Sequence, residues 1–451
     1  MTADLLGDAA QRAARYLQTL QDRRVFPEPA AIDALSALDG LVPEHGTEAA
    51  EVIALLDSLG SPATVASAGP RYFGFVTGGA LPVTVAASQL ATAWDQNAAL
   101  RVMSPVSAKL EDIAERWLCS LLGFPEGTAA SFCTGATMAN TTALAAARHT
   151  LCTRLGYDVE ADGMYDAPRL RIVVGDEVHV SVLRGLSLLG FGRDRIERVP
   201  ADAQGRIIPS AMPELDDHTI VCLQAGNVNS GALDPADAII KAAHAAGAWV
   251  HVDGAFGLWA LTLPEYADAC IGYEHADSWA TDGHKWLNVP YDCGIAFVAR
   301  RESLRNALAI SAAYLGEEGP REPSTLGPEF SRRARAVEVW SALKHLGRSG
   351  LQDLFRRNCQ AARHIAKALD GAGIQVMNDV VLNQVVVRFG DDALTQATMA
   401  AIQADGTCWA GPTVWQGDAA MRISVSSWAT TDTDVKESVE AILRVAQQTR
   451  A

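Results

Sequence analysis

Asp253 and Lys285 are the two residues whose types and spacing first suggest chemistry in this chain. Asp253 follows the apolar run 249–252, which is typical of a buried strand, and small residues come directly after it. Lys285 stands in the tripeptide His284-Lys285-Trp286. An acid at a strand end and a lysine further along predict a site built from two loops, because α/β sheets place their ligands beyond the carboxyl ends of the strands.

This pair has the residue types that pyridoxal phosphate (PLP) chemistry requires. Lys285 would form a Schiff base with the cofactor, and Asp253 would pair with the nitrogen of its pyridine ring. An opposite charge at close range favours the protonated ring, which then accepts electrons from the bond at the α-carbon that stands perpendicular to it. Loss of carbon dioxide, transamination and β-elimination all remain open on these residues alone.

A turn of small residues offers a place for a phosphate. Gly135, Ala136 and Thr137 precede a helix that the sequence predicts from Met138 to about Leu151. Free N–H groups and the dipole at a helix start can hold a phosphate, and small side chains let an anion approach the backbone. A Gly-Ala-Thr turn is also a common helix cap, so the motif by itself leaves both interpretations open.

Four further residues have side chains suited to a site. His179 follows a predicted strand, 170–175, where a histidine can stack on a planar ring, shuttle a proton or serve the structure alone. Arg422 lies on the last predicted strand, where its guanidinium can hold a substrate carboxylate or face solvent. Tyr72 and Phe73 stand in a glycine-rich turn that is either simply packed or faces the substrate.

The elements around these residues alternate between strands and helices. Strands are predicted at 170–175, 219–223, 249–252, 277–280 and 294–299, and helices at 82–100, 104–122, 138–151, 181–189 and 236–246. This alternation predicts an α/β fold with a largely parallel sheet covered on both faces. Further helices are predicted at 304–311, 333–346 and 351–369.

The two ends of the chain differ from this middle part. The C-terminal part has predicted strands near 382–388, 407–413 and 420–426, and helices near 394–404 and 432–448, which indicates a small α+β domain. Residues 1–66 have helical periodicity and need a cover for their apolar face, such as a partner subunit. The predicted division is a helical segment, 1–66, a PLP-binding large domain, 67–325, and a small domain, 326–451.

Composition excludes several classes of protein. The formal net charge of −16 disfavours general binding to nucleic acid or anionic membranes. No apolar run is long enough to span a bilayer, and the N-terminus does not have the pattern of a secretory signal. None of the 8 cysteines forms a CxxC pair, so no metal site is expected, and we predict reduced cysteines in a cytoplasmic protein.

Together, these motifs resemble those of the PLP-dependent group II amino acid decarboxylases, which share the fold of aspartate aminotransferase (PLP fold type I). The resemblance implies a large domain with a seven-stranded type of sheet, a helical N-terminal arm, a small C-terminal domain and a homodimer with shared active sites. It covers most of the chain and rests on these motifs, in the family's order: Pro70-Arg71-Tyr72-Phe73-Gly74, Ser104-Pro105 with Glu111, Thr134-Gly135-Ala136-Thr137 with Asn140, His179-Val180-Ser181, His251-Val252-Asp253-Gly254-Ala255 and His284-Lys285-Trp286-Leu287.

The resemblance also implies roles for single residues. Lys285 would carry the cofactor, Asp253 would bind its ring nitrogen, and His179 would stack on its ring. Ala255 would pack against the ring. Further cofactor contacts are implied for Gly135, Ala136, Thr137, Asp282, His284 and Gln224, and substrate contacts for Arg422, Tyr72 and Phe73.

The reaction implied by the resemblance is decarboxylation of an L-amino acid through an external aldimine and a quinonoid intermediate. Two departures from the family pattern keep a carbon–carbon or carbon–nitrogen lyase as an alternative, ahead of an aminotransferase or a non-catalytic PLP-binding protein. The stretch 316–330 lacks the tyrosine that protonates the intermediate in the decarboxylases, although Tyr314 stands just before it. Asp282 stands where aromatic decarboxylases often have asparagine, and an aspartate there is similar to the sphingosine-phosphate lyase branch.

Overall fold

The computed structural model describes residues 2–309 and 321–450. Backbone contacts divide the chain into a large unit, Ala80–Gln360 with Asn378–Gln384, and a small unit, Met1–Gly79 with Ala361–Met377 and Val385–Ala451. The N-terminal segment therefore shares a unit with the C-terminal residues. The predicted three-part division remains a prediction about parts that fold independently.

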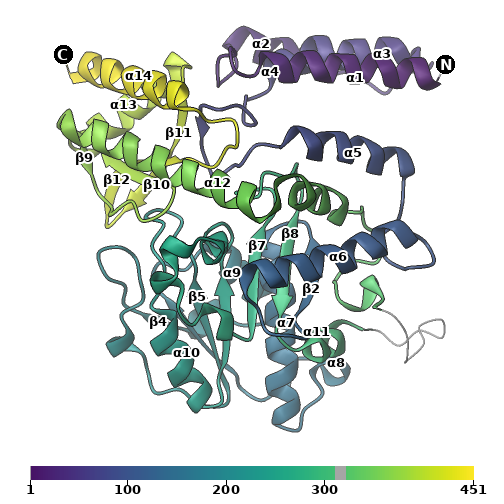
Figure 1. The fold of residues 1–451 in the computed structure, drawn as a ribbon, viewed down its shortest axis with the longest axis vertical. Coiled ribbons are helices and arrows are strands. Elements are labelled where there is room, and N and C mark those ends of the chain that lie inside the picture. Colours follow the sequence, from purple (N-terminus) through teal and green to yellow (C-terminus); the bar gives the residue numbers. More distant parts are fainter. Residues whose placement is uncertain (1, 310–320, 451) are drawn as a thin grey trace. The chain divides into compact units, whose positions relative to one another are not determined.

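The large unit contains a seven-stranded sheet in the order β2-β8-β7-β6-β5-β3-β4 (Figure 1). Only β8 runs antiparallel to its neighbours, which confirms the largely parallel sheet. The strands are β2 (Ala129–Cys133), β3 (Arg171–Gly175), β4 (Ile196–Val199), β5 (Thr219–Gln224), β6 (Trp249–Asp253), β7 (Ser278–Asp282) and β8 (Gly294–Val298). The sequence prediction missed β2, whose Ala-Ala-Ser start has low strand propensity, and β4, which has two charged residues at its centre.

The carboxyl ends of six strands lie at one edge of this sheet. Because β2 and β7 are both antiparallel to β8, they run in the same direction as β6, β5, β3 and β4. Cys133 and Asp282 both pair with Gly294, while Gln224 pairs with Asp253. This edge is where open α/β sheets bind ligands.

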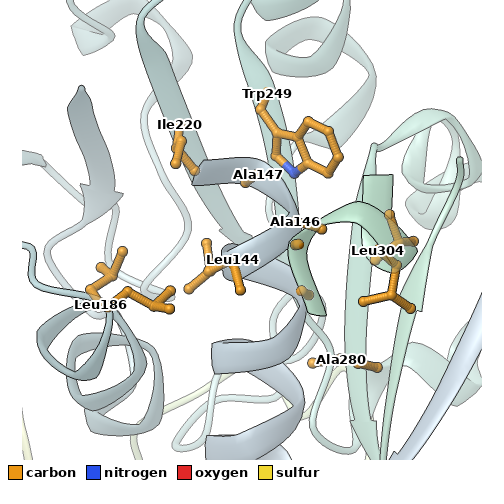
Figure 2. Close-up of a cluster of buried hydrophobic side chains, with 14 of the residues drawn as sticks. Leu144, Ala146, Ala147, Leu186, Ile220, Trp249, Ala280 and Leu304 are labelled. Carbon is orange, nitrogen blue, oxygen red and sulfur yellow. The ribbon is translucent and has the colours of Figure 1, made fainter. Parts of the chain in front are cut away.

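Helix α7 (Ala136–Arg154) packs against β6, β7 and β8, together with α9 (Val180–Leu188) and α11 (Arg301–Leu308). Figure 2 shows Leu144 and Ala147 of this helix beside Ile220 and Trp249 of the sheet. The alanines of α7 are almost all buried and allow its backbone to lie close to the strands. The central strands are buried on both faces, as their near-continuous apolar runs predict.

The other helices of the large unit are α5 (Pro82–Trp94), α6 (Pro105–Leu122), α8 (Val159–Asp162), α10 (Ala236–Ala245) and most of α12 (Ala336–Gly371), which is interrupted at Gly347. The helix predicted over 82–100 ends at Trp94, because Asp95 adopts a left-handed conformation with φ 49°. The run 82–100 is almost uncharged, which is typical of a buried or an interface helix. Because only Thr84 of α5 is buried, the interface alternative is the one that stays open, as a prediction.

The small unit has its own sheet, in the order β1-β11-β12-β10-β9, which confirms a C-terminal α+β part. Its strands are β1 (Tyr72–Phe73), β9 (Gln375–Val376), β10 (Gln384–Arg388), β11 (Trp409–Trp415) and β12 (Asp418–Ser424); β10 begins with the last residue assigned to the large unit. Its helices are α1 (Thr2–Thr19), α2 (Pro29–Asp33), α3 (Ala49–Leu55), α4 (Ser61–Ala63), α13 (Asp392–Asp405) and α14 (Asp432–Arg450). The chain segment after α1 is joined to the C-terminal part by the amide of Val25, which donates to the carbonyl of Gly406.

Candidate active site

Asp253, the last residue of β6, is held by three hydrogen-bond donors. The amide of Ala255 donates to Oδ1 at 3.1 Å. The side chains of Asn140 and Ser181 both donate to Oδ2 at 3.2 Å. The carboxylate is 5% exposed, so its orientation at the sheet edge is fixed by buried contacts from three separate segments.

His179 lies beside this carboxylate through Ser181. It is the N-cap residue of α9, and its Nδ1 accepts from the amide of Ser181 at 3.2 Å. The hydroxyl oxygen of Ser181 lies 2.8 Å from the same nitrogen and within hydrogen-bonding distance of Asp253. The structure therefore brings His179 and Asp253 together, as expected for residues that act on one ring.

Asp282, the last residue of β7, forms an ion pair with Lys285 in the loop that follows. The Nζ of Lys285 lies 3.0 Å from Oδ2 of Asp282. The other oxygen, Oδ1, is buried without a hydrogen-bond partner and lies 3.6 Å from Nε2 of His284. This part of the site holds a lysine, a histidine and a carboxylate with one unsatisfied oxygen.

His284 presents a donor in the same place. Its Nδ1 accepts from the amide of Cys293 at 3.0 Å, and Tyr291 stacks on its ring with centroids 4.3 Å apart. Burial lowers the pKa of His284, which favours the neutral ring. A neutral ring that accepts at Nδ1 has its proton on Nε2, so the Nε2–H points away from Cys293 and is available to an anion.

The predicted phosphate turn lies against these residues. Gly135 is the N-cap residue of α7, and a Cβ added there would lie 3.2 Å from the ring of His284 and 3.5 Å from Oδ1 of Asp282. A Cβ on Gly294 would lie 2.4 Å from Cα of Gly135, so the first residue of β8 must be glycine for the turn to approach. Helix amides, a histidine N–H and a lysine ammonium thus meet beside the turn, and this donor set fits the phosphate and aldehyde ends of PLP.

Ala255 connects the two halves of the site. Its amide donates to Asp253, and its carbonyl accepts from the amide of Asp282 at 2.9 Å. Gln224 ends the neighbouring strand and is buried. Its backbone amide donates to the carboxylate of Asp234, and its backbone carbonyl accepts from the hydroxyl of Tyr273.

The three residues predicted to touch the substrate belong to the small unit. Tyr72 is buried and stacks on Trp409 with centroids 5.1 Å apart, and Phe73 is 1% exposed. These contacts support the packed-turn interpretation. Arg422 lies on β12, where burial lowers the pKa of its guanidinium to about 10. Substrate contact by all three remains a prediction, and Tyr314 with the first part of 316–330 lies outside the described residues.

Sequence reasoning assigned no role to Asn140, Ser181, His251 or Ser278, all of which the structure connects to Asp253. Two of them had a periodic signal. His251 is two residues before Asp253 and so shares its face of the strand, and Asn140 is one helical turn after Ala136. Ser278 had no such signal, because its contact depends on how β6 and β7 pair.

Residues 35–389 match the family model of the pyridoxal-dependent decarboxylase conserved domain. The chain belongs to this family. It is 28% identical over 344 residues to an aromatic-L-amino-acid decarboxylase of Bacillus atrophaeus, with 73% of this chain and 69% of that protein covered. It is also 28% identical to an L-2,4-diaminobutyrate decarboxylase of Rhizobium meliloti, with 80% and 74% covered.

Solved structures confirm the fold. The structure of the Oryza sativa protein TDC with PLP and tryptamine superposes with a TM-score of 0.89 at 22% identity, covering 99% of this chain and 98% of that one. The mouse protein CSAD gives a TM-score of 0.86 at 21% identity over 99% and 98%. These comparisons and the family match confirm fold type I, PLP as the cofactor and a PLP-dependent amino acid decarboxylase as the enzyme class. Decarboxylation is thus favoured over the lyase alternative.

The described residues contain no helix that is both long and apolar enough to cross a membrane.

Proposed function

We propose that this decarboxylase binds PLP at the carboxyl edge of the seven-stranded sheet, with Asp253 at the ring nitrogen, Lys285 at the aldehyde and His179 on the ring face. The observation that carries this proposal is the convergence at the edge. Asp253 receives three donors there, and the turn at Gly135 lies against His284.

When bound, PLP supplies the ring that takes up the electrons released at the α-carbon. The part of Asp253 is to keep the ring nitrogen protonated, because its carboxylate carries the opposite charge at close range. Its three donors fix that carboxylate before the cofactor arrives. The contribution of Asp253 is therefore preorganised and needs no rearrangement during the reaction.

Lys285 must leave one partner in order to serve another. Its ammonium is paired with Asp282, so Lys285 would give up both a proton and this ion pair in order to hold the cofactor. The amine of Lys285, when it is not bound to the cofactor, would hold or deliver a proton during the reaction. We assign the same task to His179.

The phosphate would be held by the turn Gly135-Ala136-Thr137 and by the Nε2–H of His284. The helix amides of α7 are unsatisfied at its first turn and point out of the helix. Asp282 remains near this anion as a negative charge, which is the departure from the family pattern noted in the sequence.

The substrate is proposed to be an L-amino acid whose remaining contacts come from Tyr72, Phe73 and Arg422, as the resemblance implies. The named relatives differ in substrate, since one is an aromatic amino acid decarboxylase and another a diaminobutyrate decarboxylase. The substrate class is therefore a matter for measurement.

We extend the proposal to a homodimer. Large apolar side chains on the N-terminal helices are between 39 and 60% exposed, a pattern typical of a surface covered by another subunit. They include Leu6, Leu17, Leu55 and Leu56. Sedimentation of the PLP-saturated protein should give a dimer, and a fully active monomer would contradict this part.

The cysteines support a cytoplasmic enzyme. All eight are free, and seven of them are buried. Unpaired buried thiols are typical of proteins in a reducing compartment. Expression with a redox-sensitive reporter fused to the chain tests the compartment directly, and an oxidised reporter would contradict this location.

The experiment that tests the function is release of carbon dioxide from carboxyl-labelled amino acids by PLP-saturated protein. The panel contains acidic, aromatic, basic and small amino acids, with the Lys285→Ala variant as the control. Release from one class, absent in the variant, is the expected result and identifies the substrate class. Formation of ammonia or an aldehyde without carbon dioxide would overturn the proposal.

A further inference from the structure

A row of buried polar side chains leads from Asp253 into the protein, away from the residues assigned to the cofactor. We propose that Asn140, His251 and Ser278 are positioning residues, whose hydrogen bonds form one directed chain that sets the orientation of the Asp253 carboxylate. The inference rests on the proposed role of Asp253. It adds three residues that would not touch PLP but would determine how it is held.

The geometry of the chain is continuous. Nδ2 of Asn140 lies 3.2 Å from Oδ2 of Asp253, and Oδ1 of Asn140 lies 2.9 Å from Nε2 of His251. Nδ1 of His251 lies 3.0 Å from the hydroxyl oxygen of Ser278, which accepts from the indole of Trp249 at 2.9 Å. Asn140, His251 and Ser278 are each 0% exposed, and Trp249 is 1% exposed.

The direction of the first link is forced by the carboxylate. An ionised carboxylate only accepts hydrogen bonds, so Asn140 must present its NH₂ group to Asp253. Its carbonyl oxygen then faces His251. A carbonyl oxygen also only accepts, so the Nε2 of His251 must carry a proton.

The protonation state of His251 fixes the remaining links. Burial lowers the pKa of His251 to about 3, so the ring is neutral at ordinary pH. A neutral ring with its proton on Nε2 has a lone pair on Nδ1, which therefore accepts from the hydroxyl of Ser278. The oxygen of Ser278 in turn accepts from Trp249, whose indole can only donate.

The chain therefore has a single direction, from Trp249 to Asp253. The opposite tautomer of His251 would bring a nitrogen lone pair against the carbonyl of Asn140. Turning the amide over to relieve this would bring its carbonyl against Asp253. Both alternatives leave buried polar atoms opposed, so the tautomer of His251 and the hydrogen bond from Asn140 to the carboxylate are coupled.

The chain also joins three elements. Asn140 is on α7, the helix that begins at the phosphate turn, while His251 and Ser278 are on β6 and β7. The ring end and the phosphate end of the site are thereby tied to one another at a fixed separation. If these residues served the structure alone, their substitution would change only the stability of the protein. If they position Asp253, their substitution must also change the chemistry of bound PLP.

The test compares the Schiff-base absorbance of PLP-saturated variants across a pH titration, together with the PLP dissociation constant. Asp253→Asn is measured first and should shift the titration midpoint upward, because a less protonated ring no longer disfavours a positive charge on the Schiff base. Asn140→Leu and His251→Leu should move the midpoint in the same direction and weaken PLP binding about tenfold, since each leaves a buried group without its partner. His251→Gln should restore most of both, because its amide nitrogen takes the place of Nε2.

The far end of the chain supplies the matched control. Trp249→Phe removes the most side-chain volume but acts on Asp253 through three intervening residues, so its spectral effect should be the smallest of the series. The effect should be similar to that of Trp279→Phe, which changes a buried tryptophan on β7 whose indole donates to Tyr273 instead. The positioning role would be overturned if the spectral shifts of the variants followed the side-chain volume that each one loses. It would also be overturned if His251→Gln restored neither the midpoint nor PLP binding, even where Asp253→Asn behaves as expected. An unchanged titration in Asp253→Asn would instead overturn the proposed role of Asp253 itself.

Discussion

The two ends of the candidate site differ in how completely the chain satisfies its own polar groups. At the ring-nitrogen end, Asp253 accepts from Ala255, Asn140 and Ser181, and the chain behind it is matched donor to acceptor. At the lysine end, Asp282 has one buried oxygen without a hydrogen bond and its other oxygen on Lys285. One end is complete without a ligand, and the other is not.

The difference shows which end is prepared in advance and which must exchange partners when the cofactor binds. Buried polar atoms in folded proteins almost always have partners, so an unsatisfied one marks a place where something else binds or where a group must move. Asp253 must keep a single position during turnover, whereas Lys285 must exchange its partner. The following predictions test this contrast.

The largest effect is expected at Lys285. Replacement by alanine removes the side chain proposed to form the Schiff base, so the absorbance band of the Schiff base should disappear and kcat/KM should fall by about 1000-fold or more. Absorbance spectra and initial rates check this. Lys241→Ala, an exposed lysine paired with Asp237, is the control and should behave as wild type. A retained band that borohydride reduces would assign the Schiff base to another lysine.

Asp253→Asn, at the ring-nitrogen end, should have the next largest effect. The amide keeps the shape and some of the hydrogen bonds, so PLP should still bind, but loss of the charge should lower kcat by about 100-fold. Rates at saturating substrate measure this. Asp277→Asn removes a carboxylate that accepts from the amide of Val250, outside the chain that leads to Asp253, and should leave kcat unchanged. Near-normal turnover in Asp253→Asn would contradict the claim that the ring-nitrogen end is fixed in advance for catalysis.

A smaller effect is expected at the lysine end, from Asp282→Asn. The substitution removes a negative charge beside the phosphate turn and keeps a side chain of the same size, so PLP should bind several-fold more tightly. It also frees Lys285 from its ion pair. Fluorescence titration of the apo-protein with PLP gives the dissociation constant. Weaker binding would mean that the carboxylate assists the cofactor, and the two ends would then be alike.

The smallest effect concerns how the free energy of unfolding depends on pH through the buried His251. The pKa of His251 lies at about 3 in the folded protein and at 6.5 ordinarily, so below pH 6.5 the unfolded chain binds a proton that the folded one does not. Stability should therefore fall as the pH drops from 6.5 towards 3, by about 1.5 kcal/mol between pH 6.5 and 5 from this group alone.

Urea unfolding of PLP-saturated wild type and His251→Gln at these two pH values isolates that contribution, because the other titrating groups are common to both. The difference in unfolding free energy between the two proteins should shrink at the lower pH. An equal difference at pH 6.5 and pH 5 would mean that His251 is already charged, or is not buried in solution.

Much of the fold followed from the sequence, and the reasons for the misses are physical. β5, β6 and β8 are apolar runs and were predicted within a residue or two. β2 is made of small residues with weak strand preference, and β1 has only two residues, Tyr72 and Phe73, whose pairing with β11 is non-local. Tertiary pairing, which no local pattern encodes, creates both strands.

The site divides in the same way. Lys285, Asp253 and His179 are chemically distinctive and stand at or shortly after the ends of strands, so residue type and position were enough to single them out. Ser278 and Asn140 act only through partners on other elements, and their side chains have no reactivity of their own. The orphaned oxygen of Asp282 could not be foreseen either, because satisfaction of a hydrogen bond is a property of the folded chain.

The most direct test of the account is reduction of the PLP-saturated protein with borohydride, followed by digestion and mass spectrometry. The account predicts a single pyridoxyl adduct on the peptide that contains Lys285, with no adduct in the Lys285→Ala protein. An adduct on a different lysine would contradict the assignment of the site to the carboxyl edge of the seven-stranded sheet.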